Sequence, residues 1–199
     1  MIRFREYLDN FFRLTNEEWS SLSAHINTIH LKKGTTIYEF INTHGGLCFI
    51  AKGIIRSYLV NKSGRDYTLN FYCANTQDVT NRIILSSSLF SQLYKNQESS
   101  EIAFEILTDA TLYCINREDL KKLCSEKSIW KDFFQFLLES YYSAAQERII
   151  ALLTKNSQER LKMLEEYFPV LFQKNISLEH IASYIGITRQ SLNRVKRKD

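Results

Sequence analysis

The sequence predicts an α+β protein in which an antiparallel β-roll is followed by a long helix and a small all-α domain containing a helix-turn-helix. Short runs of β-branched and aromatic residues, separated by turn signals, extend from about residue 26 to residue 115. A helical pattern without proline or glycine covers residues 128–154, and two short helical patterns then meet at Gly186. We therefore expect three parts, which are residues 1–127, 128–155 and 156–199.

The composition is that of a folded globular protein. Of the 199 residues, 44% are hydrophobic and 24% are charged, which excludes wholesale disorder and fibrous repeats. The apolar runs are far shorter than the roughly 20 residues that cross a bilayer, and the first residues lack a signal-peptide pattern. We expect a cytoplasmic protein without a membrane partner. Four widely spaced cysteines, without a CxxC pair, are expected to be reduced and mostly buried: Cys48, Cys73, Cys114 and Cys124.

The N-terminal segment is expected to form short helices before the strands begin. Thr15 and Glu18 have the spacing of a capping box, in which each side chain accepts the other residue's backbone N–H. Apolar residues follow at helical spacing. After the strands, Asn116 is a suitable cap for a helix over residues 117–125.

The strands of the predicted roll are short and separated by turns. Residues 53–60 and 66–72 flank a glycine-containing turn, so we expect a β-hairpin. Leu69 and Phe71 alternate with polar neighbours, which indicates a half-buried strand. Further strands are expected over residues 101–107 and 111–115. Regularly spaced short strands favour an antiparallel roll, sandwich or barrel.

The long helical pattern carries an apolar band wider than one partner sheet needs. We expect one side of this helix to pack on the roll and the other on a second copy of the protein. A helix that packs only within its own chain is the alternative. The residues expected at the dimer helix are Phe134, Leu137, Leu138, Tyr141, Tyr142, Ala145, Ile149 and Leu152.

Positive charge is concentrated near the C-terminus. The net charge is only +4, but residues 156–199 hold eight basic and five acidic side chains. Five of those basic residues lie from Arg189 onward, against a single acid, Asp199. Such a local excess suits a phosphate-binding surface. The alternative is a solvated terminal helix whose cations complement its dipole.

Residues 177–196 match a helix-turn-helix at several positions. Ser177 is placed to cap a first helix whose inner face carries Ile181 and Ile185, and Gly186 allows a tight turn. Thr188 is placed to cap the second helix. Apolar residues of that helix, Leu192 and Val195, face inward, whereas its outer face is basic and polar. Arginine can offer a bidentate fork to guanine, and glutamine or asparagine can pair with adenine.

With these motifs in order along nearly the whole chain, the sequence resembles the short-chain subgroup of the Crp/Fnr family of bacterial transcription regulators. Local matches are KKGT at residues 32–35, IAKGIIR at 50–56 and ERI at 147–149. The resemblance implies a roll of the cyclic-nucleotide-binding type, a dimerisation helix and a DNA-binding helix-turn-helix. The expected partners are double-stranded DNA, a second copy of the chain and, for an activator, RNA polymerase.

The resemblance also assigns roles within the last helix. The family's recognition helix typically reads Ser or Thr, Arg, Glu, Thr, and then Arg three residues later. Residues 188–194 read TRQSLNR, with Gln190 in place of the usual acid and Ser191 in place of Thr. Arg189, Gln190 and Arg194 are therefore the expected base readers. The amide of Gln190 would favour adenine and so a changed operator. Backbone or secondary contacts to DNA are expected from Ser177, Thr188, Ser191, Asn193, Lys196, Arg197 and Lys198.

The family's cyclic-AMP site is not evident. Asn81 and Arg82 stand where a Gly-Glu pair would hold the ribose, and residues 83–100 contain no arginine for the cyclic phosphate. We expect no cofactor and no cyclic AMP bound in the usual mode; any other effector is unknown. Arg82 could hold another anion, although a surface arginine is the favoured interpretation.

Catalytic and metal-binding motifs are missing from the sequence, so we do not expect an enzyme. The four histidines do not form the ligand set of a metal-dependent β-roll enzyme, and no N-terminal cysteine cluster suits an iron–sulfur centre. The sequence does not exclude a haem whose axial ligand is His25, His44 or Cys48, but an ordinary structural role is favoured for each of these residues.

We interpret the chain as a homodimeric, sequence-specific DNA-binding transcription regulator that acts on a near-palindromic operator, with control by an effector in the roll left open. The alternative is a small-molecule-binding or protein-interaction module of the cyclic-nucleotide-binding-like fold that does not bind DNA.

Overall fold

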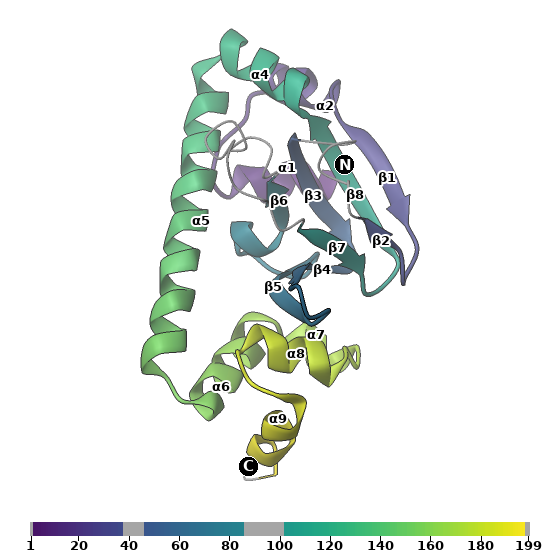
Figure 1. The fold of residues 1–199 in the computed structure, drawn as a ribbon. Coiled ribbons are helices and arrows are strands. Elements are labelled where there is room, and N and C mark those ends of the chain that lie inside the picture. Colours follow the sequence, from purple (N-terminus) through teal and green to yellow (C-terminus); the bar gives the residue numbers. More distant parts are fainter. Residues whose placement is uncertain (1, 38–45, 86–101, 198–199) are drawn as a thin grey trace.

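The computed structural model describes residues 2–37, 46–85 and 102–197, which form a β-roll flanked by one long helix and underlain by short helices (Figure 1). The N-terminal helices are α1 (Ile2–Asp9) and α2 (Asn16–Ser23). The strands are β1 (Asn27–Leu31), β2 (Thr36–Ile37), β3 (Gly46–Lys52), β4 (Ile54–Val60), β5 (Asp66–Cys73), β6 (Ile83–Leu85), β7 (Ala103–Ile106) and β8 (Ala110–Asn116), with a 3-10 helix η1 (Val79–Asn81) before β6. The later helices are α4 (Arg117–Glu126), α5 (Ser128–Thr154), α6 (Ser157–Tyr167), α7 (Pro169–Gln173), α8 (Leu178–Tyr184) and α9 (Arg189–Val195).

The strands form two antiparallel four-stranded sheets, in the orders β1-β8-β3-β6 and β2-β7-β4-β5. This confirms the α+β class with an antiparallel roll. The expected hairpin is β4 and β5, and the predicted strands at residues 101–107 and 111–115 correspond to β7 and β8. Between β3 and β4 the chain turns at Gly53, where φ is +99° and an added Cβ would lie 2.7 Å from Ala110. Only glycine fits this close approach without strain.

Several helix boundaries follow from caps that the sequence predicts. Thr15 and Glu18 form the complete capping box at α2, and the Asn116 side chain accepts the N–H of Asp119 at the start of α4. Asn156 caps α6 in the same reciprocal way with Glu159. Pro169 follows the end of α6 and begins α7, a short helix that the sequence analysis did not predict.

Among the described residues the buried hydrophobic side chains form three clusters, and one of them joins the roll to the C-terminal helices. A first cluster packs α1, α2, α4 and the start of α5 against β3, and another fills the roll. The third lies between β5 and helices α6–α9. Within it the ring of Phe71 from β5 lies 6.0 Å from Phe168 and 5.3 Å from Tyr184, measured between centroids. The C-terminal helices therefore share a hydrophobic core with the roll.

The hairpin strand β5 is more deeply buried than the sequence predicted. Thr68 was expected on the polar side of a half-buried strand, but it is buried because α8 covers that face of the sheet. A register shift between Ser57 and Tyr58 of β4 also breaks the simple alternation of the hairpin. Phe71 consequently packs against the C-terminal helices, whereas Tyr72 packs inside the roll.

Two cysteines are bonded rather than reduced. Cys48 on β3 and Cys114 on β8 occupy directly paired positions and form a disulfide. The expectation of four reduced thiols was wrong because the two residues are 66 positions apart and meet only through the register of these strands. Cys73 and Cys124 are free.

Candidate nucleic-acid interface

Helices α8 and α9 are joined by a turn that local hydrogen bonds define. The Ser177 hydroxyl accepts the N–H of Glu179 at the start of α8, and Thr188 Oγ1 accepts the N–H of Ser191 at the start of α9. Gly186 lies between them with φ at +73°, a conformation that suits glycine. The next N–H, that of Ile187, bonds to the carbonyl of Ala182 at 2.9 Å and closes the turn.

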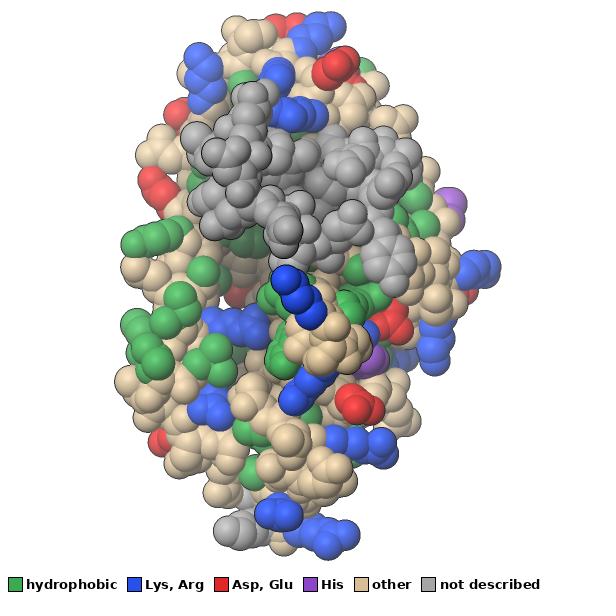
Figure 2. All heavy atoms as spheres, viewed as in Figure 1, with side chains coloured by type: hydrophobic (Ala, Val, Ile, Leu, Met, Phe, Trp, Pro, Cys, Tyr) green, Lys and Arg blue, Asp and Glu red, His purple; other side chains and the backbone are tan. Residues whose placement is uncertain are grey.

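The two faces of α9 differ sharply. Leu192 is fully buried and Val195 packs beside it, so this side of the helix belongs to the core. The expected base readers are all exposed to solvent: Arg189, Gln190 and Arg194. No acidic residue occurs in α9, and its last turn carries Arg194. Figure 2 shows basic side chains at the bottom tip of the molecule, where α9 lies.

The other residues expected to contact DNA have different surroundings. Asn193 and Arg197 are exposed, and Lys196 Nζ lies 5.4 Å from the ring centroid of Phe172 in α7. Ser177, Thr188 and Ser191 take part in the caps described above, and Thr188 and Ser191 also share a 3.0 Å hydrogen bond between their hydroxyls. Lys198 lies outside the described residues.

Helix α8 is attached to the roll by polar contacts as well as by the core. The backbone N–H of Thr68 in β5 donates to Ser183 Oγ at 2.9 Å. Arg148 of α5 donates from Nη2 to the carbonyls of both Thr68 and Tyr184, each at 3.1 Å. Arg160 of α6 donates from Nε to the carbonyl of Ile185 at 2.9 Å. These bonds fix the position of the α8–α9 pair relative to the sheet.

A buried charge network lies on the same sheet face, next to α8. Arg56 is 3% exposed and donates to Glu105 at 2.6 Å and to Asp66 at 2.7 Å. Burial opposes its charge, but the hydrogen bonds to these two carboxylates raise the pKa of Arg56. His180 of α8 lies 3.9 Å from Glu105, and its pKa is lowered by burial and by the nearby Arg56.

Arg56 and Arg148 lie within the local matches to the Crp/Fnr family, IAKGIIR and ERI, but neither was predicted to have a structural role. An arginine within a β-branched strand such as β4, or on the apolar band of a helix such as α5, is the signal that could have identified them. A charge at such a position must find partners when the segment is buried.

The residues at the positions of the family's cyclic-AMP site make contacts within the chain. Asn81 Nδ2 donates to Asp78 at 3.0 Å. Arg82 donates to the carbonyl of Thr76, and its guanidinium lies 4.5 Å from the Tyr7 ring centroid and 4.7 Å from that of Phe49. The favoured interpretation of Arg82 as a surface arginine was therefore wrong. Its side chain packs against two aromatic rings that also contact each other, because α1 packs over this part of the roll.

No protein-family model and no curated protein sequence matches this chain. Solved structures do match. A protein described as a Crp/Fnr transcriptional regulator from Eubacterium rectale superimposes with a TM-score of 0.67 at 22% identity, covering 97% of this chain and 87% of that one. FixK2 from Bradyrhizobium japonicum superimposes with a TM-score of 0.63 at 15% identity, covering 87% of this chain and 83% of that one. A cyclic nucleotide-binding domain protein from Listeria monocytogenes superimposes with a TM-score of 0.61 at 14% identity, covering 92% of this chain and 85% of that one.

The chain has the fold of the Crp/Fnr regulators. Two matched structures with this fold, from Eubacterium rectale and Xanthomonas campestris, are described as regulators rather than enzymes. Within the described residues, no group of three or more histidine, cysteine, aspartate or glutamate side chains could hold a metal ion. His44, one of the three candidate axial haem ligands, lies outside those residues. No described helix is both long enough and apolar enough to cross a membrane.

In this Crp/Fnr fold, α5 runs along the side of the roll and leaves part of its apolar surface uncovered (Figure 1). Leu138, Tyr142, Ile149 and Leu152 are exposed large hydrophobic residues, and Ala145 is exposed between them. Green side chains are visible along this helix in Figure 2.

Three residues predicted for the dimer helix face the roll instead. Leu137 is fully buried and Phe134 is partly buried in the cluster below α5. The hydroxyl of Tyr141 donates to the carbonyl of Ile83 in β6. The assignment of Leu137 to a dimer contact was wrong because adjacent helical residues point about 100° apart, so a broad apolar band divides between two sides. For Phe134 and Tyr141, which are partly exposed, a dimer contact stays a prediction.

Proposed function

We propose that this protein is a sequence-specific DNA-binding transcription regulator and that α8 and α9 form its helix-turn-helix. The observation that carries the proposal is the division of α9 into a buried side with Leu192 and an exposed, acid-free side with Arg189, Gln190 and Arg194. In a helix-turn-helix, the second helix lies in the major groove and its N-terminal residues reach the base edges. The exposed end of α9 has the residue types for that contact.

The cations of α9 and of the residues that follow it divide by position into two roles. Arg189 and Arg194 can each present two N–H donors to guanine, and Gln190 can pair with adenine. Beyond the end of α9, Lys196, Arg197 and Lys198 provide charge for phosphates. Contacts of this second kind give affinity and salt dependence without sequence information.

We propose that the active form is a homodimer joined along α5. The exposed residues Leu138, Tyr142, Ala145, Ile149 and Leu152 are spaced alternately by four and three residues, which is the a/d pattern of a two-stranded coiled coil. A second copy of the same helix covers such a seam by symmetry. The two α9 helices then read half-sites about 34 Å apart, so the operator is a near palindrome.

Regulation of this dimer by cyclic AMP bound in the usual mode is not part of the proposal. Asn81 and Arg82 stand where the family's Gly-Glu pair would hold the ribose, and both side chains make contacts within the chain. Another effector remains compatible with the roll. If the regulator is an activator, its further partner is RNA polymerase.

A binding experiment tests the DNA-binding role. The affinity of the full chain for a labelled, random-sequence 30-base-pair duplex is measured by fluorescence anisotropy between about 50 and 200 mM salt. We expect affinity that falls steeply with salt, that weakens in Arg197→Ala and that is unchanged in Lys122→Ala, which removes an exposed cation from α4. Absence of salt-dependent duplex binding, or equal losses in both variants, would favour a ligand-binding or protein-binding module without a DNA role.

A further inference from the structure

A groove of about 680 Å³ separates the turn of the β4–β5 hairpin from the beginnings of α8 and α9. The turn contributes Arg65 and Asp66 to one wall. The facing wall includes four residues for which contacts to DNA are expected: Ser177, Thr188, Arg189 and Gln190. A strand of the roll and the two helices of the helix-turn-helix therefore share one concave surface.

Local hydrogen bonds define the turn that carries Arg65. The Asn61 side-chain oxygen accepts the N–H of Ser63 and the N–H of Arg65, each at 3.0 Å. The N–H of Gly64 donates to the carbonyl of Asn61 at 2.9 Å, and φ at Gly64 is +80°. The Arg65 side chain is exposed, with its guanidinium 5.2 Å from the Tyr67 ring centroid. This turn thus presents a cation at the edge of the groove.

The groove has an excess of positive charge. Within the described part of the chain, neither Arg65 nor Arg189 forms an ion pair with a carboxylate, and both side chains are exposed. The acids on the wall are Asp66 and Glu179. Asp66 is already bonded to the buried Arg56 at 2.7 Å, so its charge is balanced within the chain. Two unpaired guanidinium groups therefore face one exposed carboxylate, a balance that favours an anionic partner.

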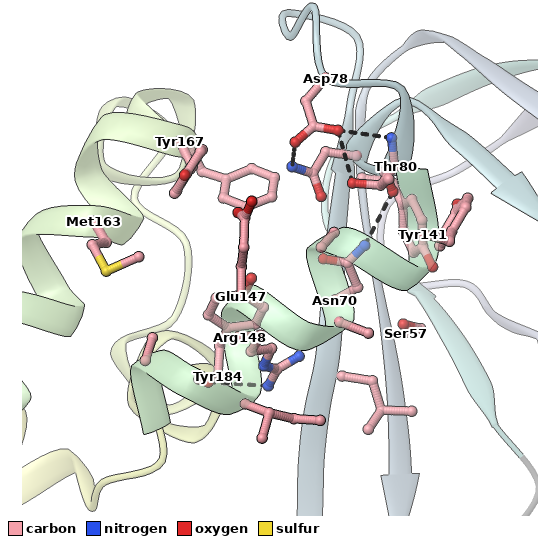
Figure 3. Close-up of a pocket in the computed structure, with 18 of the residues that line it drawn as sticks. Ser57, Asn70, Asp78, Thr80, Tyr141, Glu147, Arg148, Met163, Tyr167 and Tyr184 are labelled. Carbon is pink, nitrogen blue, oxygen red and sulfur yellow. Dashed lines mark hydrogen bonds between the residues drawn. The ribbon is translucent and has the colours of Figure 1, made fainter. Parts of the chain in front are cut away.

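The hairpin is joined directly to α8, so the turn has a defined place relative to α9. Three residues after the turn, the N–H of Thr68 donates to Ser183 Oγ at 2.9 Å. Arg148 donates to the carbonyls of Thr68 and Tyr184, each at 3.1 Å, and Figure 3 shows the bond to Tyr184. A molecule that reaches the exposed start of α9 therefore meets the turn in the same place each time.

The docking geometry of a helix-turn-helix brings the DNA backbone to this groove. The second helix enters the major groove, and the first helix crosses the backbone beside it. Here α8 is the first helix, and the groove borders its beginning. The strand that passes α8 consequently comes opposite the β4–β5 turn. Figure 2 shows Lys and Arg side chains above the bottom tip as well, over the part of the molecule where Figure 1 places β5 and α8.

We propose that Arg65 contacts a phosphate of the DNA backbone, so that the β-roll itself forms part of the DNA-binding surface. The inference rests on the proposed function, because α8 and α9 determine where the backbone runs. A phosphate contact of this kind adds affinity and salt dependence without sequence information, and it fixes the orientation of the protein on the duplex.

Matched substitutions test the contact. The affinity of the full chain for a labelled 30-base-pair duplex is measured by fluorescence anisotropy between about 50 and 200 mM salt. Lys62→Gln removes an exposed cation of the same turn that does not line the groove, and Arg13→Gln removes an exposed arginine between α1 and α2. We expect Arg65→Gln to weaken binding about threefold or more and to lower the salt slope by about one for each bound subunit. Lys62→Gln has less than half of this effect, and Arg13→Gln has none.

Neutral phosphates locate the contact. Single methylphosphonate replacements remove one backbone charge at a time from a preferred duplex. We expect one replacement in each half-site to weaken wild type but not Arg65→Gln, because the variant has already lost the partner of that phosphate.

Two results would overturn the contact while leaving the proposed function intact. The first is wild-type duplex binding that Arg65→Gln and Lys62→Gln weaken equally, and the second is the absence of any methylphosphonate whose effect depends on Arg65. A wild-type protein that binds no duplex in a salt-dependent way would contradict both the proposed function and this contact.

Discussion

The guanidinium of Arg148 lies over the ring of Tyr184, 4.2 Å from its centroid, and donates to the carbonyl of the same residue at 3.1 Å. This contact joins α5 to the end of α8, directly before the turn that leads into α9. A movement of α5 can therefore displace α8, and with it the exposed face of α9, through this contact.

The turn at Gly186 gives a stability prediction with an internal control. Alanine at this position must adopt φ of +73° and bring its Cβ to 3.0 Å from Leu152 Cδ2. We expect Gly186→Ala to lower the free energy of unfolding by about 1–2 kcal/mol. Gly64→Ala has a similar φ of +80° with no atom within 4 Å, so it reports the backbone cost alone. Urea unfolding that gives equal losses for both variants would show that the Leu152 contact adds nothing.

The seam on α5 predicts a specific loss of dimer. Ile149 and Ile150 are both 56% exposed, but only Ile149 belongs to the a/d pattern. We expect Ile149→Glu to convert the protein to a monomer, because it places two like charges at the centre of the helix pair, whereas Ile150→Glu stays dimeric. Sedimentation velocity measures the mass of each variant. Dissociation by both substitutions, or by neither, contradicts the proposed seam.

The Arg56 network gives a prediction for acid stability. Its hydrogen bond to Arg56 lowers the pKa of Asp66, so the carboxylate contributes stability above its unfolded pKa, about 4. This contribution is lost as the pH falls through the lower, folded pKa. Asp66→Asn should therefore reduce the thermal midpoint at pH 7 and flatten its decline below about pH 4. Melting curves of both proteins from pH 7 to pH 2 test this, and parallel curves would argue against the role given to Asp66.

The two classes of cation on α9 and after it differ in what they contribute to DNA binding. Arg194→Ala should cost about 1–3 kcal/mol on the preferred site and relax discrimination at one base pair in each half-site. Arg197→Ala should weaken all sequences alike and lower the magnitude of the salt slope by about one. Titrations of both variants with preferred and random duplexes measure these effects. Equal losses on both duplexes for both variants would contradict the division of roles.

The sequence predicted the features that depend on neighbouring residues. Caps at Thr15, Asn116, Ser177 and Thr188 are formed by side chains within three positions of the N–H groups they accept, so local patterns reveal them. The order of strands and helices followed from the same kind of signal. Gly186 was identified for a similar reason, because the turn it allows is itself local.

The sequence did not predict contacts made between distant segments. The Cys48–Cys114 bond depends on strand register, and the partners of Arg148 come from β5 and α8. Which apolar residues of α5 face inward also depends on how the helix is rotated against the roll. Leu137 and Leu138 are adjacent and equally hydrophobic, yet Leu137 is buried and Leu138 is exposed.

Selection of bound duplexes from a random DNA pool at near-physiological salt, with no ligand added, tests the central claim most directly. The wild-type protein and Arg194→Ala are compared side by side. We predict that wild type enriches a near palindrome with half-site centres about one helical turn apart, and that the variant loses preference at one base pair of each half-site. Enrichment of no sequence by the wild type, or of the same sequence to the same extent by both proteins, would contradict the account.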